Sequence, residues 1–176
     1  MKNKLTFLTI TLTMAANLAI AAPGPNNKPV ATVEAKVRHD FNRFLNYGIF
    51  DNLEFRVEGG SVTLLGQTNR PVLRSDAANI VRHIEGVTSV TNEIEVLPVS
   101  FFDDGIRLRV ARSVYGQSAL NRYALGTHPS IHVIVKNGNV SLEGVVAREM
   151  DRIIAGLQAN SVPGVFSVQN NLRIEK

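Results

Sequence analysis

Apolar and polar residues alternate in two pairs of short segments, and each pair brackets a turn. The segments 53–57 and 131–135 place apolar side chains at every second position, which predicts strands with one buried side. A glycine pair at 59–60 follows the first segment, and Asn137-Gly138 follows the second. A second alternating run begins directly after each turn, so the sequence predicts two β-hairpins.

After each hairpin the apolar period lengthens to about 3.6 residues, which predicts a helix packed on the strands. A further helix precedes each hairpin, and an alternating segment at 90–96 or 168–174 closes each half as a last strand. The predicted order is therefore α-β-β-α-β, present twice. The apolar positions that define the four helices are Val33, Val37, Phe41 and Phe44; Leu73, Ala77, Ile80, Val81 and Ile84; Ile106, Val110 and Val114; and Met150, Ile153, Ile154, Leu157 and Val162.

An internal repeat relates the two halves. Placing residues 62–96 over 140–174, an offset of 78 without gaps, gives 11 identities in 35 positions, where composition alone gives about two. We therefore expect an α+β protein of two tandem αββαβ domains, each a small three-stranded mixed sheet packed with two helices. The residues expected to shape its turns and strand ends are Gly66, Gly86, Asn92, Gly138, Gly144, Gly164 and Asn170.

The N-terminal residues have the pattern of a secretory signal peptide. Lys2 and Lys4 precede an apolar run that is shorter than the roughly 20 residues a membrane span needs, and a small-x-small site ends at Ala21. An uncleaved anchor is the alternative. Because both domains are small and the linker is short, we expect the copies to pack on each other or on a partner. The predicted organisation is a signal peptide at 1–21, a flexible segment at 22–32, domains at 33–97 and 103–176, and a linker at 98–102.

Composition narrows the chemistry. The chain has no cysteine, which excludes disulfides, thiol catalysis, iron–sulfur clusters, thiolate zinc sites and a cysteine-linked lipid anchor. Residues 33–97 carry 7 basic and 9 acidic side chains, whereas residues 103–176 carry 9 basic and 6 acidic ones. The basic excess therefore belongs to the second domain.

The pattern N-G-x-V-x-L-x-G, followed by a helix and then by G-V-x-x-V-x-N-x-L, resembles the BON domain of secreted and periplasmic bacterial proteins. Residues 137–144 and 164–172 fit it closely, and residues 59–66 and 86–94 fit it more loosely. A tandem pair behind a signal peptide is similar to the osmotically inducible periplasmic protein family. The resemblance implies a non-enzymatic periplasmic protein that associates with phospholipid membranes or envelope proteins in osmotic or envelope stress tolerance.

No catalytic or metal-binding constellation can be assembled, so we expect no enzyme activity, no cofactor and no metal. The histidines at 39, 83, 128 and 132 lack metal-ligand spacing, and placement on the surface is the favoured interpretation of His132. The repeated glycines coincide with predicted turns rather than with a phosphate-binding loop. A KH-type G-x-x-G loop is missing and the protein is predicted to be exported, so we expect no nucleic-acid partner.

The first helix of the second domain is the candidate binding surface. Its buried stripe leaves Leu108 and Tyr115 on the far side beside Arg109 and Arg112, an arrangement that suits an anionic phospholipid surface. Alternatively, Leu108 and Tyr115 pack on the first domain or in an oligomer, and the arginines pair with an acidic strand face. The protein would then be an interaction or structural module of the periplasm without lipid binding. The candidate membrane-binding residues are Arg107, Leu108, Arg109, Arg112, Tyr115 and Arg122.

Overall fold

The computed structural model describes residues 32–125 and 128–175, which belong to one compact unit running from Ala31 to Lys176. The predicted signal peptide and nearly all of the predicted flexible segment lie outside the described residues. The first copy contains α1 (Val33–Phe44), β1 (Asn52–Glu58), β2 (Ser61–Thr68), α2 (Pro71–Arg82), β3 (Ser89–Asn92) and β4 (Glu95–Val96). The second contains α3 (Phe101–Tyr115), the 3₁₀ turn η1 (Asn121–Ala124), β5 (Ile131–Lys136), β6 (Asn139–Val146), α4 (Glu149–Asn160), β7 (Ser167–Asn170) and β8 (Arg173–Ile174).

Local sequence signals set the starts of three helices. The Thr32 hydroxyl accepts a hydrogen bond from the Ala35 N–H at the start of α1. The Ser100 hydroxyl does the same for Asp103 in α3, so this helix begins at Phe101, inside the predicted linker. Proline occupies the first turn of α2, where its missing N–H removes no helical hydrogen bond.

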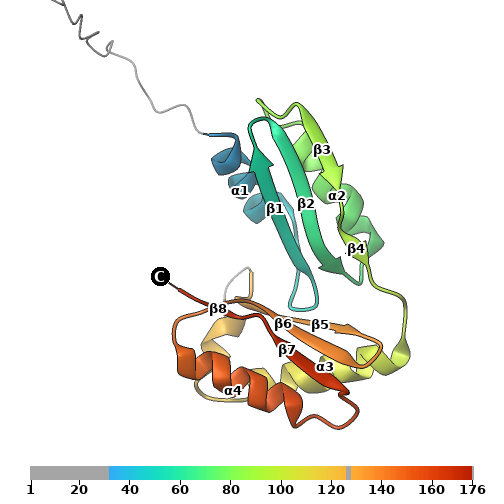
Figure 1. The fold of residues 1–176 in the computed structure, drawn as a ribbon, viewed down its shortest axis with the longest axis vertical. Helices are drawn as coiled ribbons and strands as arrows, with labels where there is room; N and C mark the ends of the chain where they lie inside the picture. The colour runs from blue at the N-terminus through green and yellow to red at the C-terminus, as the bar shows by residue number, and fades with distance from the viewer. Residues whose placement is uncertain (1–31, 126–127, 176) are drawn as a thin grey trace, which may run out of the picture. The chain divides into compact units, whose positions relative to one another are not determined.

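The predicted α+β class and duplicated αββαβ order are confirmed. In each copy both helices lie on one face of a mixed sheet (Figure 1). Leu53 pairs with Gly66 in the antiparallel β1–β2 ladder, and Ile131 pairs with Gly144 in the β5–β6 ladder. The parallel ladders of β2 with β3 and of β6 with β7 also correspond residue for residue at the offset of 78. The two copies therefore have the same strand register.

The last strand of each copy is interrupted, so the structure has two short strands where the sequence predicts one. The Asn92 side chain donates to the Arg74 carbonyl at 2.7 Å and accepts from the Ile94 N–H at 3.2 Å. Asn170 makes the equivalent pair of bonds, to the Arg152 carbonyl and the Leu172 N–H. Each asparagine thus bonds to nearby backbone where the ladder pauses, which is the role expected from its place in the sequence.

Gly66 and Gly144 occupy equivalent positions that a side chain would block. Their φ angles are +107° and +118°, in the region that residues with a Cβ rarely adopt. A Cβ at either residue would lie 2.0 Å from a backbone oxygen of the neighbouring strand end. Positive φ angles also occur at Gly86, Gly138 and Gly164, the other glycines expected to shape turns.

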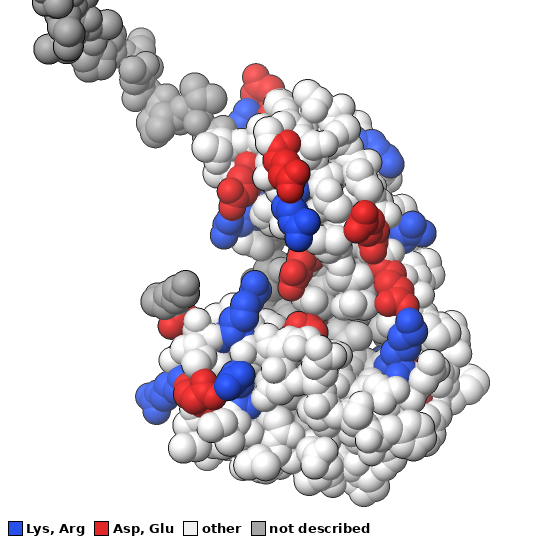
Figure 2. Space-filling model, viewed as in Figure 1, with Lys and Arg blue, Asp and Glu red and all other residues white. Residues whose placement is uncertain are grey.

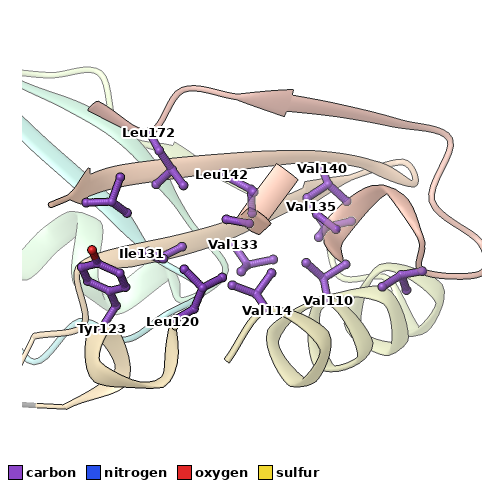
Figure 3. Packing of buried hydrophobic residues seen from close by; sticks show 14 of the residues in the cluster. Val110, Val114, Leu120, Tyr123, Ile131, Val133, Val135, Val140, Leu142 and Leu172 are labelled. Carbon is purple, nitrogen blue, oxygen red and sulfur yellow. The ribbon is translucent and has the colours of Figure 1, made fainter. Parts of the chain in front are cut away.

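Each copy has its own apolar core between the sheet and its helices. In the second copy Val110 and Val114 of α3 meet Val133 and Leu142 of the sheet, all fully buried (Figure 3). In the first copy the predicted stripe of α1 is wrong at one position. Phe44 is 59% exposed, and the next residue, Leu45, enters the core instead because the helix ends there.

The predicted apolar stripe of 150–162 holds at Ile154 and Val162, which pack in the core, and is wrong at three positions of α4. Met150, Ile153 and Leu157 are 61%, 44% and 64% exposed, whereas Ala155 and Ala159 are fully buried. Small side chains let this helix approach the sheet closely, so its larger apolar residues remain on the outer side. The apolar spacing is that of a helix whichever face is buried. Packing against the sheet, and not the sequence pattern, therefore decided which face of α4 is buried.

The two copies contact each other through the segment between α1 and β1. Phe50 of this segment packs against the core of the second copy, and the Val133 N–H of β5 donates to the Ile49 carbonyl at 2.7 Å. Lys136 of β5 also pairs with Glu95 of β4 at 2.6 Å. Because β5 is an edge strand, these contacts cover an edge that would otherwise offer free backbone groups.

Candidate functional site

The second copy presents an apolar and basic helical surface. Helices α3 and α4 pack side by side, and the Ser113 hydroxyl donates to the Gln158 side chain at 3.0 Å between them. Leu108 is 55% exposed on α3, and the large apolar residues of α4 are exposed beside this helix. Residues 153–172 contain no charged side chain, and Figure 2 shows the surface over the C-terminal part of α4 as largely uncharged. The outer helical face comprises Leu108, Arg109, Arg112, Met150, Ile153 and Leu157.

The carboxylates of α3 and α4 do not offset the arginines of this face. Asp103 and Asp151 are buried and bond to other parts of the second copy. Asp104 and Glu149 each pair with an arginine of the same helix. Arg109 and Arg112 form no salt bridge with any carboxylate of the described residues. The outer helical face therefore carries uncompensated positive charge.

The first helices of the two copies can be aligned, and the alignment shows where their charged residues differ. Val33 of α1 lies against Gly86, and Ile106 of α3 lies against Gly164, the glycine equivalent to Gly86. Val33 and Ile106 therefore occupy equivalent positions.

With this alignment Arg109 corresponds to Lys36 of the first copy. Lys36 pairs with Glu85 at 2.9 Å. The position of Glu85 is held in the second copy by Pro163, which has no charge. The second copy thus keeps the cation and lacks its partner.

The same difference recurs one turn later. His39 contacts Asp40 at 2.9 Å in the first copy. Arg112 and Ser113 hold these two positions in the second copy, so a permanent cation replaces histidine and the carboxylate is absent. Arg109 and Arg112 also line a shallow groove between α3 and the end of α4, together with Ser161 and Pro163.

Arg107 does not lie on the outer helical face. Its side chain is 2% exposed, pairs with Asp104 and donates to the Val135 carbonyl at 2.6 Å. Its neighbour Asp103 accepts hydrogen bonds from two N–H groups of the turn at 137–138. The proposed membrane role of Arg107 is therefore wrong in geometry, because this residue joins α3 to the β5–β6 hairpin.

Tyr115 is also not an exposed anchor. Its ring packs against the core of the second copy, and its hydroxyl donates to the Ile131 carbonyl. Burial raises the pKa of this hydroxyl, so it stays protonated and keeps donating. Leu108, by contrast, stays exposed, so the alternative in which it packs on the first domain is not what the structure shows.

Arg122 lies in η1, and its side chain is 42% exposed. It pairs with the buried Asp151 and donates to the Tyr123 hydroxyl at 2.7 Å. Asp151 stands where the first copy has Leu73, a core residue. A polar network thus replaces an apolar contact in the second copy, and the charge of Arg122, unlike that of Arg109 and Arg112, has a carboxylate partner.

The Tyr123 hydroxyl is central to this network, and its removal should be measurable. It donates to Asp151 at 2.7 Å and accepts from the Ala147 N–H at 2.8 Å. We expect Tyr123→Phe to lower the free energy of unfolding by about 2 kcal/mol, because the buried Asp151 carboxylate loses a donor and the Arg122 and Ala147 N–H groups lose an acceptor. Tyr47→Phe removes the same atom where no hydrogen bond is present in the described structure, and should change stability by less than about 0.5 kcal/mol. Urea denaturation followed by circular dichroism compares them, and equal losses would contradict this role.

His132 is not on the surface, contrary to the sequence interpretation. It is 8% exposed because the segment between α1 and β1 covers the second face of β5. His128 and His132 both lie near Tyr47, with ring centroids 4.5 and 5.9 Å from its own. Within residues 32–125 and 128–175, no three His, Asp or Glu side chains converge in a way that could hold a metal ion.

Sequence reasoning found Leu108, Arg109 and Arg112 and missed the contribution of α4. The sequence contained a signal for the contribution of α4. Three large apolar residues of this helix replace mostly polar residues of α2: Met150, Ile153 and Leu157 align with Val72, Ser75 and Asn79. Such a change between duplicated helices indicates an altered exposed face. Among the helices of the described residues, none has the length and apolar character needed to cross a membrane.

A duplicated two-layer αββαβ module with its distinctive residues on an outer helix layer defines a tandem protein of small binding modules. The chain belongs to the BON domain family, whose pattern matches residues 30–98 and 117–176, more than two thirds of the sequence. BON domains are envelope-associated modules that interact with membranes or proteins.

Two solved structures are similar over most of the chain. CdsD, a structural protein of the type III secretion system of Chlamydia trachomatis, aligns with 13% identity and a TM-score of 0.30, covering 82% of this chain and 93% of that one. The C-terminal domain of CdsD aligns with 12% identity and a TM-score of 0.27, covering 80% and 96% respectively. No curated protein matches the chain.

Proposed function

We propose that the protein is an exported, non-enzymatic binding protein of the bacterial periplasm that associates reversibly with anionic phospholipid surfaces through the outer helical face. Its wider role would be tolerance of osmotic or envelope stress, as the resemblance to the osmotically inducible periplasmic family implies. A binding role without catalysis is supported by the buried carboxylates Asp51, Asp103 and Asp151, since each is bonded to groups that hold the fold together.

The observation that carries the proposal is the pair of unpaired arginines beside exposed apolar side chains. Arg109 keeps the cation position of Lys36, and Arg112 places a permanent cation where the first copy has His39. The carboxylates that contact Lys36 and His39 have no counterpart in the second copy, so an external anion can pair with these arginines. Leu108 on α3 and Leu157 on α4 can enter the interfacial layer of a bilayer while the arginines stay at headgroup level.

The magnitudes favour weak and reversible binding. Each arginine near an anionic membrane contributes about 1 kcal/mol, and this contribution is screened by salt. Burial of apolar side chains adds about 25 cal/mol per Å² removed from water. Two arginines and a few partly inserted side chains give association rather than permanent anchoring.

Vesicle sedimentation tests the proposal directly. The protein is mixed with vesicles of phosphatidylcholine alone or of phosphatidylcholine with phosphatidylglycerol, at about 0.05 M and about 0.5 M salt. We expect sedimentation with the anionic vesicles at low salt, a large decrease at high salt, and little sedimentation with the neutral vesicles.

Absence of sedimentation with anionic vesicles, or equal sedimentation with both kinds, would overturn the lipid assignment. The uncharged apolar stripe of Ile153 and Leu157 would then favour the second candidate, an interaction module that binds an envelope protein through α4. Salt-independent capture of one protein from a periplasmic extract, lost on Leu157→Asp, would support that role.

A further inference from the structure

Two histidines of the second copy form hydrogen bonds with backbone carbonyl groups of the first copy. The ring nitrogen Nε2 of His128 lies 2.8 Å from the Asn42 carbonyl oxygen, and Nδ1 of His132 lies 3.2 Å from that of Gly48. The Tyr47 ring contacts both imidazoles and stacks on His128 at an interplanar angle of 17°. The histidine latch comprises Tyr47, His128 and His132.

Hydrogen-bonding chemistry defines which ring nitrogen of each latch histidine carries the proton that is donated. A carbonyl oxygen only accepts, so each histidine donates from the nitrogen that faces it. For His128 this leaves Nδ1 as the unprotonated nitrogen of the neutral ring, and this atom is buried without a hydrogen-bond partner in the described residues.

Burial is nearly complete for His132, which is 8% exposed. Removal from water is the largest influence on His132 and lowers its pKa, whereas its hydrogen bond to the Gly48 carbonyl raises the pKa. The nearby His128 lowers the pKa, and the net direction is downward. Asp51 acts in the opposite direction, but its carboxylate already bonds to Arg70 and Thr68 at 2.6 Å each.

The remaining charged groups lie in the groove beside the latch. Glu54 of β1 and Arg173 of β8 line this groove with His132. Glu143, the cross-strand neighbour of His132 on β6, is bonded by the Asn171 side chain at 2.6 Å, and partial burial raises its pKa. Both carboxylates bond to asparagine side chains, and neither forms a hydrogen bond with an imidazole of the latch.

We propose that the histidine latch is a pH-sensitive connection between the two copies, closed when the buried His132 is neutral and opened when His132 is protonated. Opening separates the 47–50 segment from β5 and frees the edge of this strand. The inference is independent of lipid binding, because its residues lie outside the outer helical face.

The direction of the pH effect on the contact follows from the lowered pKa of His132 in the folded protein. A histidine whose pKa is lower in the folded protein than its ordinary 6.5 stabilises the contact fully above that value. The stabilisation is lost as the pH falls through the lowered folded value. The contact should therefore be intact at pH 7.5 and weakened near pH 5.

The Val133 N–H is a built-in reporter, since it donates to the Ile49 carbonyl of the other copy. We expect its hydrogen-exchange protection factor, measured by NMR and corrected for intrinsic pH dependence, to fall at least about tenfold from pH 7.5 to pH 5. Amides of the central strands β2 and β6 should keep their protection, which distinguishes opening from unfolding.

Side chains that donate a hydrogen bond but do not change their protonation state with pH provide the decisive comparison. His128→Gln with His132→Asn places amide N–H groups where Nε2 and Nδ1 donate, so protection of Val133 should stay constant between pH 7.5 and pH 5. His39→Gln with His83→Gln removes the same number of titratable groups from exposed positions of the first copy and should leave the full response.

Three results would overturn the proposal: no change at Val133 in the unmodified protein, a full response in the latch variant, or loss of the response in the exposed-histidine variant. If the latch variant does not fold, NMR titration of His132 in the unmodified protein decides the matter. A midpoint that coincides with loss of Val133 protection supports the latch, and a midpoint that differs by more than one pH unit overturns it.

Discussion

Replacing Gly144 by alanine is expected to destabilise the protein by about 4 kcal/mol, the largest single-residue effect that the structure predicts. Gly144 has a φ angle of +118°, and an added Cβ would lie 2.0 Å from the Ser130 carbonyl oxygen. The backbone fixes the position of a Cβ and the oxygen is itself a backbone atom, so no side-chain rotation relieves the overlap. Unfolding by urea, followed by circular dichroism, gives the change in stability.

Gly59 provides the matched control. Its φ angle is also positive, +61°, but no atom lies within 4 Å of an added Cβ. Gly59→Ala should therefore cost only the conformational penalty of about 1 kcal/mol. Losses that agree within 1 kcal/mol would show that conformation, and not the close approach to Ser130, explains the glycine. Gly66→Ala should behave like Gly144→Ala, because the two positions are equivalent.

Charge reversal at Arg109 and Arg112 is expected to abolish vesicle binding. Each substitution to glutamate removes about 1 kcal/mol of attraction to an anionic surface and adds repulsion of similar size. The double variant should thus lose about 4 kcal/mol, close to a thousandfold in affinity. The fold should tolerate both changes, because both side chains are exposed and form no salt bridge in the described structure. Sedimentation with phosphatidylglycerol vesicles at low salt measures the loss.

A variant with the same net charge separates a local surface from a general electrostatic effect. Arg74 and Arg82 are exposed on α2 of the first copy and form no salt bridge with a described carboxylate. Arg74→Glu with Arg82→Glu should retain most of the binding. If both double variants lose binding equally, net charge controls association and the outer helical face is not the site.

The hairpins and their register could be predicted because the signal is local and repeated. The alternation at 53–57 and 131–135, with a turn after each, defines which residues pair, and a slip of one position would expose every buried side chain. The resemblance of residues 137–144 to the BON motif added the family, which the match over both copies confirmed.

The candidate site was predicted less completely, since exposure depends on what packs against each helix. Leu108 and Tyr115 both lie off the buried stripe of α3, yet only Leu108 is exposed. Tyr115 is covered because its hydroxyl reaches the Ile131 carbonyl of the sheet. Arg107 is a charged residue that periodicity alone assigns to solvent, and a carbonyl with an adjacent carboxylate holds it inside.

The sequence by itself determined the duplication, the order of elements and the strand register, because these follow from hydrophobic period and from turns between neighbouring residues. The tertiary structure decided which face of α4 is buried, which arginines lack partners, and that His132 lies beneath the 47–51 segment of the other copy. These features depend on contacts between residues that are distant in sequence, where the size of a packed side chain and the presence of a counter-charge cannot be read from local pattern.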